Sequence, residues 1–413
     1  MNLEIDAIRK SLTGLVSLKT FDSDQAVADA FARVALSIIS EPGDRFAGWL
    51  ATRYRPSAII EMFLNGFKFD EFLSADAQTE LEVKFGRLDA LFLDAVERWL
   101  PRLSLSAVNQ SLSTARQLEG RIIFRDEQFW PQGLNDLQEG APHVLWLRGN
   151  PKVLALSDRS ISVVGSRLAS TYGEAATTSL VSAAVAEQLA VISGGAYGID
   201  SIAHRATIAL DGFTVAVLAG GIDRMYPAGN FDLLSRIAKT NVIVSEQPPG
   251  SSPTKWRFLQ RNRLIAALGS ATVVVEAGAR SGALNTATHA EKLGREIGAF
   301  PGRFDSPQSA GCHDLIRSGK AVLIGNPSHA IELVLGASES GHAAGEAKSE
   351  IGALETRALD ALTSKAAPAS KIAAKAGLTA MEVMIALGSL ELLGFAVRRG
   401  SGWVRVGKVG PAN

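Results

Sequence analysis

Residues 189–200 have the sequence "LAVISGGAYGID", a short β-branched run that ends in glycines and leads into a helix-length stretch. The same order of strand-like run and helical stretch recurs from Ile161 onward, which is typical of βαβ units in a parallel sheet. Several runs are continuously apolar, so we expect helices on both faces of the sheet. The runs that predict six or seven parallel strands are "ISVVG" (161–165), "LAVISGG" (189–195), "TVAVLAGG" (214–221), "NVIVSE" (241–246), "ATVVVEAG" (271–278), "EIGAFPG" (296–302) and "AVLIG" (321–325).

Both ends of the chain differ from this central region. Apolar residues at spacings of three and four in "DQAVADAFARVALSII" (24–39) and "LDALFLDAVERWLPRL" (88–103) predict helices, the second ended by Pro101. Acidic residues outnumber basic ones over the first hundred residues, which favours a structural module over a DNA-binding one.

The C-terminal part begins after a stretch of Gly, Ala, Ser and Glu at 336–352, which predicts a flexible linker. Beyond it we expect a helix over 354–362, a second capped by Ser370, and a third capped by Thr379. A hairpin around a Gly-Ser-Gly turn follows in "FAVRRGSGWVRV" (395–406). Three helices and a hairpin predict a winged helix-turn-helix domain.

The predicted fold class is therefore α/β, with an extended Rossmann-like, doubly wound and mostly parallel sheet between two helical parts. A chain of 413 residues is long enough for two or three domains. The predicted division is a helical module of SAM-like or helix-hairpin type at 1–105, the Rossmann domain at 106–335, the linker at 336–352 and the winged helix at 353–413.

The amino-acid composition argues against several kinds of site. The single cysteine, Cys312, leaves no internal disulfide and no paired-cysteine zinc motif. The six histidines are scattered, so we expect neither a metal nor another cofactor. The first residues include acids and no long apolar run, which predicts neither a secretory signal nor a membrane span, and so a cytoplasmic protein.

Turns rich in Gly, Ser and Arg follow the predicted strands, where doubly wound sheets bind ligands. Glycine allows close backbone approach, and the helix behind each turn offers N–H groups to phosphate oxygens. The dinucleotide fingerprint G-x-G-x-x-G after the first strand and the phosphate loop GxxxxGK[ST] are both missing from the sequence. This combination favours a phosphate backbone or an unusual nucleotide as ligand.

Four cations fall within nine residues in "KWRFLQRNR" (255–263), and no carboxylate occurs between Glu246 and Glu276. Since a solvated helix face usually intersperses acids, this stretch indicates an anion site. Arg257 and Arg261, four residues apart, should share one helix face. Trp256 and Phe258 interleave with the cations, as stacking residues do in single-strand binding sites, although either could be part of the core.

Together these motifs resemble the DNA-processing protein A family (DprA, also called Smf). The resemblance rests on motifs in the family's order: "GSR" (165–167), "SGGAYGIDSIAH" (193–204), "VLAGGIDRMYPAGN" (217–230), "SEQPPG" (245–250), "FLQRNRLIA" (258–266), "VVVEAGARSGALNTATHA" (273–290) and "FPGRFDSPQSAGCHDLIRSGKA" (300–321). The stretch at 124–150 looks like the family's lead-in to the sheet. Leu259 stands where the family often has proline.

The resemblance implies a homodimeric protein without catalytic turnover. It would bind and protect single-stranded DNA and load the RecA recombinase during natural transformation and recombination. Carried over to this sequence, the DNA groove would include Gly165, Ser166, Arg167, Gly194, Gly195, Gly198, Arg205, Arg261, Asn262 and Arg263. The charge pattern adds Lys255 and Arg257, although Arg261 and Arg263 are favoured over these two.

An enzyme is the rival hypothesis. The same sheet occurs in phosphoribohydrolases of the lysine-decarboxylase-like group, which use a PGGxGTxxE motif. Here His289 stands at the place of the motif glutamate after Thr286, and Glu291 comes two residues later. A misplaced carboxylate is a poor acid or base, so this hypothesis is the weaker one. Cys312 and His313 are adjacent and diverge by about 100° on a helix, which disfavours a nucleophile–base pair.

The predicted recognition helix of the winged helix, 380–393, contains two glutamates and neither Lys nor Arg. A helix that enters the major groove should offer donors to phosphates and base edges. We therefore expect the domain to contact a DNA backbone through its second helix and wing, or to bind a protein. The cations available for this are Lys371, Lys375, Arg398, Arg399 and Arg405.

Overall fold

The computed structural model describes residues 4–65, 72–336 and 352–406. The chain divides into two compact units, Met1–Ser340 and Gly341–Asn413. The predicted linker at 336–352 lies almost wholly outside the described residues. Each unit is described below by itself.

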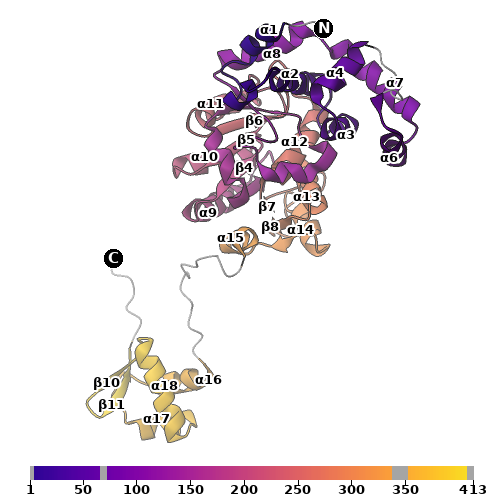
Figure 1. Ribbon diagram of the computed structural model, residues 1–413. Coiled ribbons are helices and arrows are strands. Elements are labelled where there is room, and N and C mark those ends of the chain that lie inside the picture. Colours follow the sequence, from indigo (N-terminus) through magenta and orange to yellow (C-terminus); the bar gives the residue numbers. More distant parts are fainter. Residues whose placement is uncertain (1–3, 66–71, 337–351, 407–413) are drawn as a thin grey trace. The chain divides into compact units, whose positions relative to one another are not determined.

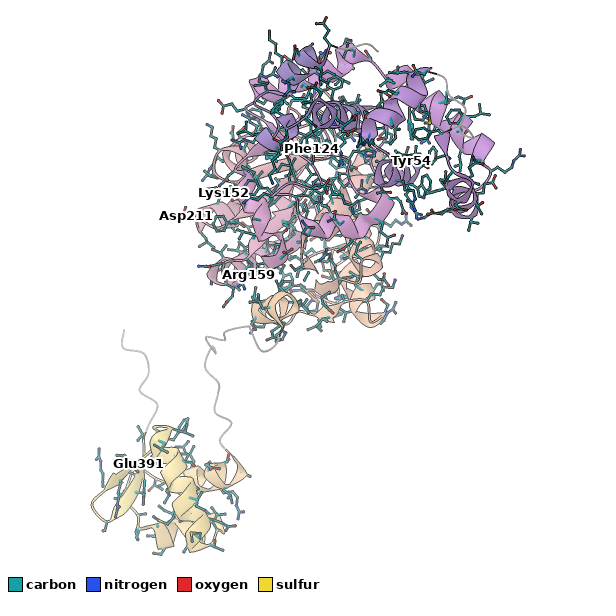
Figure 2. All side chains as sticks on the ribbon, in the orientation of Figure 1. Tyr54, Phe124, Lys152, Arg159, Asp211 and Glu391 are labelled. Atoms are coloured by element: carbon teal, nitrogen blue, oxygen red, sulfur yellow. The ribbon has the colours of Figure 1, made fainter. Side chains whose placement is uncertain are left out.

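Helices form the first part of the larger unit (Figure 1). Tyr54, which is labelled in Figure 2, packs against Trp49 and Phe72, with ring centroids 6.3 and 4.7 Å away. Fully buried Trp49 and Trp99 lie in a core that also contains sheet residues such as Trp146. The N-terminal helices therefore stabilise the sheet region directly, and the four-part domain division stays a prediction. The helices are α1 (Ile5–Leu12), α2 (Asp24–Ile39), α3 (Arg45–Arg53), α4 (Pro56–Asn65), α6 (Ala75–Phe85), α7 (Leu88–Trp99) and α8 (Leu105–Gln117).

Within the described residues, the central sheet has nine strands in the order β1-β2-β6-β5-β4-β3-β7-β8-β9. Neighbours from β6 to β9 pair in parallel, whereas β2 pairs antiparallel with both β6 and β1. All seven predicted strands are present: β3 (Ser160–Val164), β4 (Ala190–Ser193), β5 (Thr214–Val217), β6 (Val242–Ser245), β7 (Ala271–Val274), β8 (Glu296–Ala299) and β9 (Val322–Leu323). The sequence did not predict β1 (Arg121–Ile123) and β2 (Leu145–Gly149), which extend one edge. The expected mixed α/β fold with a mostly parallel sheet is thus confirmed.

Helices cover both faces of this sheet, as its apolar strands require. Figure 1 shows α9, α10 and α11 on one side of the sheet and α12, α13 and α14 on the other. The chain runs from β3 outward to β6, then returns to place β7 on the other side of β3. This reversal makes the carboxyl ends of β3 and β7 the topological switch point. The helices are α9 (Thr171–Ala186), α10 (Ile199–Ala209), α11 (Phe231–Thr240), α12 (Lys255–Leu268), α13 (Gly282–Lys292), α14 (Ala310–Arg317) and α15 (Pro327–Leu335).

The smaller unit contains α16 (Ala353–Ala361), α17 (Ala369–Ala376), α18 (Ala380–Leu392) and a hairpin of β10 (Ala396–Arg399) and β11 (Gly402–Arg405). Thr379 caps α18 in a capping box with Glu382, as predicted. The predicted cap of the second helix is wrong, because α17 already begins at Ala369 and no side chain caps it. The smaller unit has a hydrophobic core of its own, which includes Leu387, Leu390 and Trp403.

No single helix among the described residues is long and apolar enough to cross a membrane; the bent pair α17 and α18 passes on length and composition only.

Candidate functional site

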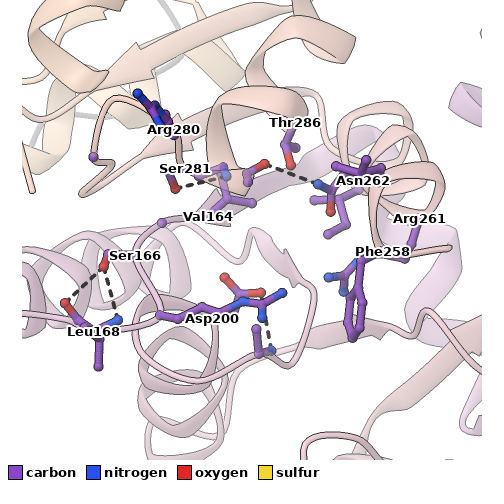
Figure 3. A pocket seen from close by; sticks show the side chains of 18 of the residues that line it. Val164, Ser166, Leu168, Asp200, Phe258, Arg261, Asn262, Arg280, Ser281 and Thr286 are labelled. Carbon is purple, nitrogen blue, oxygen red and sulfur yellow. Dashed lines mark hydrogen bonds between the residues drawn. The ribbon is translucent and has the colours of Figure 1, made fainter. Parts of the chain in front are cut away.

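A cavity of about 1000 Å³ opens at the switch point of the sheet. The turns after β3, β4 and β7 contribute its walls, together with the first half of α12. Figure 3 shows Ser166 and Leu168 on one side of the space, Phe258 and Asn262 on another, and Arg280 and Ser281 on a third. Six of the predicted site residues line the cavity: Gly165, Ser166, Arg167, Lys255, Arg261 and Asn262.

The glycines of the turn after β4 have a supporting role. Gly198 has a φ of +73°, and a Cβ there would clash with the carbonyl oxygen of Ser166. The next residue, Ile199, donates its N–H to that same oxygen at 3.1 Å. The turn after β4 therefore holds in place the loop that presents Arg167. Gly194, Gly195 and Gly198 are not among the described residues that line the cavity.

Arg261 connects α12 to the ends of two strands. Its Nη1 donates to the carbonyl oxygens of Gly194 and Val217, both at 2.6 Å, and only 6% of the residue is exposed. A Cβ at Gly194 would occupy the position of this guanidinium, so glycine is required there. Burial lowers the pKa of Arg261 to about 10, which still leaves it charged at neutral pH. Arg261 is mainly a structural cation.

Phe258 lies between two guanidinium groups. The Cζ atom of Arg167 is 5.3 Å from the ring centroid, and that of Arg261 is 5.7 Å away. The ring of Tyr226, half exposed, lies 5.6 Å from Phe258 at a tilt of 55°. A half-buried aromatic ring in a cavity, held beside cations, is a suitable surface for a planar ligand to stack on.

Three cations on the cavity wall are exposed: Arg167, Lys255 and Arg280. Arg280 lies in one of the turns rich in Gly, Ser and Arg, the one that follows β7, but it was not among the predicted site residues. Among the described lining residues, Asp200 is the only carboxylate. It accepts the N–H of Gly194 at 3.1 Å, and burial raises the pKa of Asp200. The open part of the cavity is therefore cationic.

Arg263 and Arg257, two predicted DNA contacts of the cationic stretch, stay predictions, although each has a partner from elsewhere in the chain. Arg263 and Arg257 do have carboxylate partners, Glu246 and Glu41, with nitrogen–oxygen distances of 2.6 and 3.2 Å. Arg263 is 5% exposed and meets both oxygens of Glu246, so its charge is already neutralised inside the protein. Neither arginine is among the described residues that line the cavity.

Arg205, another predicted site residue, lies on α10 and is exposed. Its Nη2 donates to Oδ1 of Asn230 at 3.3 Å, and it is outside the set of described residues that line the cavity. Any DNA contact of Arg205 would therefore lie on the surface around the cavity, and it stays a prediction.

The residues of the enzyme hypothesis do not meet in the cavity. His289 and Glu291 are not among its described lining residues, and Glu291 pairs with Lys320 at 3.0 Å. Cys312 is fully buried, and burial raises the pKa of its thiol to about 12. A thiol with so high a pKa is a poor nucleophile. The described residues include no group of three or more His, Cys, Asp or Glu side chains that could hold a metal.

Comparison with known proteins agrees with the sequence motifs. A family model described as "DNA recombination-mediator protein A" matches residues 121–335, more than half of the chain. The chain belongs to this family. The family's description names recombination, and its relatives from Bacillus subtilis and Streptococcus pneumoniae are named DNA processing proteins.

Individual relatives extend the match beyond the sheet. The DNA processing protein DprA of Mycobacterium tuberculosis is 42% identical over 301 residues, covering 69% of this chain and 76% of that protein. Protein Smf of Escherichia coli is 31% identical over 339 residues, covering 80% and 88% of the two chains. The X-ray structure of DprA from Streptococcus pneumoniae has a TM-score of 0.55 at 28% identity and covers 73% of this chain and 95% of that one.

Proposed function

We propose that the cavity at the switch point binds one strand of DNA, and that the protein acts in recombination by holding single-stranded DNA. The observation that carries this proposal is the exposed set of Arg167, Lys255 and Arg280 around the half-buried ring of Phe258. Cations attract the phosphates, and the aromatic ring offers a stacking surface for a base. A single strand can supply both groups at once.

A single strand fits this chemistry better than a duplex. Bases of duplex DNA are already stacked and paired, so Phe258 could stack on them only after costly unstacking. The candidate site is also a recess at the end of a sheet, whereas a duplex is read by a helix or hairpin that projects into its groove. Arg167 and Lys255 are expected to contact phosphates, whereas Arg261 and Arg263 are expected to stabilise the elements that form the binding surface.

The protein is proposed to bind without catalytic turnover. Asp200, whose carboxylate accepts backbone N–H groups, is committed to shaping the turn after β4. Neither Glu291 nor His289 lies beside it on the cavity wall. The enzyme hypothesis therefore lacks a placed acid or base.

Family membership supports further proposals about partners. The bound strand would be protected and passed to the RecA recombinase, during natural transformation or other recombination. A homodimer is also proposed, through the edge of the sheet at β9, where Val322 and Leu323 are 47% and 48% exposed. An unpaired, apolar edge strand readily pairs with another chain.

The smaller unit is proposed to be a winged helix-turn-helix domain, with α18 in the position of a recognition helix. No Lys or Arg lies on α18, and Glu391 is exposed on it (Figure 2). We therefore expect truncation after residue 340 to leave affinity for an oligonucleotide within severalfold. A large loss of affinity in the truncated protein would instead make the smaller unit a main DNA contact.

The direct test is a fluorescence anisotropy titration with a labelled oligothymidylate. The variant Arg167→Ala with Lys255→Ala should bind at least tenfold more weakly than the native protein, since each charge-assisted contact contributes about 1 kcal/mol or more. Arg317→Ala is the matched control, because Arg317 is exposed on α14 and pairs with Asp314 outside the cavity wall. Equal binding by all three proteins would refute the cavity as the DNA site.

A further inference from the structure

Thr286 on α13 has an unusual hydroxyl group. Elsewhere in the helices, α13 included, threonine hydroxyls donate to the carbonyl oxygen four residues earlier: Thr177 to Gly173, Thr207 to Ala203 and Thr288 to Leu284, at 2.6 to 2.9 Å. Thr286 is only 1% exposed, yet its hydroxyl has no hydrogen-bond partner among the described residues. The hydroxyl is not among the fully enclosed side-chain atoms that lack a partner, and Thr286 lines the cavity, so this group is open to a ligand there.

Asn262 on α12 occupies the carbonyl oxygen to which the Thr286 hydroxyl would otherwise donate. The carbonyl oxygen four residues before Thr286 belongs to Gly282, and it accepts the side-chain Nδ2 of Asn262 at 3.2 Å. The same Nδ2 donates to Oδ1 of Asn285, also at 3.2 Å. Both hydrogens of the amide are thereby used, which fixes the orientation of the Asn262 side chain.

This orientation leaves a second polar atom free. The Oδ1 atom of Asn262 has no partner among the described residues, although the residue is only 8% exposed. Asn262 and Thr286 both line the cavity, and Figure 3 shows them on its α12 and α13 side. The cavity wall thus offers one atom that only accepts a hydrogen bond and a hydroxyl that can donate one.

The residues around Asn262 and Thr286 indicate which class of ligand would bind there. Val164, Ile265 and Ala283 are apolar residues that line the same cavity. An acceptor-only oxygen repels phosphate and requires an N–H group on the ligand. A nucleobase meets both demands, because every Watson–Crick edge carries an N–H donor next to a ring nitrogen or carbonyl acceptor.

We propose that Asn262 and Thr286 form a pocket for the Watson–Crick edge of one unpaired base. The proposal rests on the proposed DNA-binding function and deepens it. The Oδ1 atom of Asn262 accepts the base N–H, and the Thr286 hydroxyl donates to the neighbouring acceptor. All four bases satisfy this pattern, so the pocket is tolerant of sequence. Base pairing occupies the same edge in a duplex, so the pocket selects single strands.

The test combines a protein variant with a modified DNA. Two labelled oligonucleotides are titrated by anisotropy, one of thymidine and one of N3-methylthymidine, which has lost the N–H donor. The native protein should bind the methylated oligonucleotide about fivefold more weakly, the effect of roughly one hydrogen bond. Thr286→Val should bind the thymidine oligonucleotide about fivefold more weakly. Because the N3 methyl group keeps the base out of the pocket, the variant should bind the methylated oligonucleotide as the native protein does.

Thr288→Val is the matched control on the same helix, because Thr288 is exposed and its hydroxyl is bonded to Leu284. It should leave both affinities unchanged. The comparison of the two oligonucleotides with native protein needs no variant, so it tests the pocket even if Thr286→Val folds poorly. Equal affinity of the native protein for both oligonucleotides would overturn the base pocket.

The variant Arg167→Ala with Lys255→Ala separates this proposal from the proposed function. If it loses affinity for both oligonucleotides while methylation and Thr286→Val have no effect, the DNA site stands and the base pocket fails. If it keeps full affinity for both, the DNA site itself is wrong.

Discussion

Arg167 and Arg263 illustrate two kinds of cation near the same binding site. Arg167 is exposed, lines the cavity and lies over Phe258. Arg263 is 5% exposed, is not among the described residues that line the cavity, and forms an ion pair with Glu246. The comparison teaches that a run of positive charge contains both ligand contacts and structural supports, and that only the fold separates them.

Removal of Arg263 tests the structural side of this comparison and should have the largest effect. Arg263→Met leaves Glu246 as an unpaired carboxylate in a largely buried place, since 12% of its side chain is exposed. Loss of one partner of a buried pair costs about 3–5 kcal/mol. Urea unfolding should show this loss, and the double variant Arg263→Met with Glu246→Met should regain much of it.

Phe258 tests the ligand-facing side. Phe258→Leu removes the ring while keeping an apolar side chain between Arg167 and Arg261. Loss of one stacked base should weaken oligothymidylate binding by about 1–3 kcal/mol. The salt dependence of binding should stay as it was, because no charge is removed; a changed slope would mean that Phe258 acts by positioning the arginines.

Features that are set by neighbouring residues in the sequence could be predicted, whereas contacts between segments far apart in the sequence could not. The parallel strands could be predicted because each is a local apolar run, as in "ISVVG" and "ATVVVEAG". Strand β1 is three residues long and pairs only with β2, so it carries little local signal. The partner of Arg263 could not be predicted, because Glu246 comes beside it only when the end of β6 packs near α12.

The candidate site divides in the same way. Gly165, Ser166, Arg167, Lys255, Arg261 and Asn262 were predicted and line the cavity, since they follow a strand or lie on the helix beside it. Arg280 was missed, although its position in a glycine turn after β7 was a usable signal. Thr286 was noted only within the enzyme motif, because its missing hydrogen bond depends on Asn262 from another helix.

The pH dependence of the free energy of unfolding tests the burial of His204 on α10. His204 is fully buried, and burial lowers its pKa to about 3. The unfolded chain, with an ordinary pKa near 6.5, binds this proton more tightly, so stability falls as pH drops below about 6.5 towards 3. The free energy of unfolding should fall by about 1 kcal/mol for each pH unit in this range. Urea midpoints of His204→Asn should depend less on pH than those of the native protein.

Arg280 should give the smallest effect. Arg280→Ala removes one exposed cation from the cavity wall. If it contacts one phosphate, the slope of log affinity against log salt should become less steep by about 0.7. Stability should be unchanged in urea. An unaltered slope would restrict the phosphate contacts to Arg167 and Lys255.

The most direct test measures both unfolding free energy and oligothymidylate affinity in the same two variants, Arg167→Ala and Arg263→Met. The expected result is a crossed pattern. Arg167→Ala should lose affinity and keep the native unfolding free energy. Arg263→Met should lose stability, while its folded fraction binds the oligonucleotide nearly as tightly as the native protein. The account would be contradicted if Arg263→Met lost affinity without losing stability, or if Arg167→Ala bound the oligonucleotide normally.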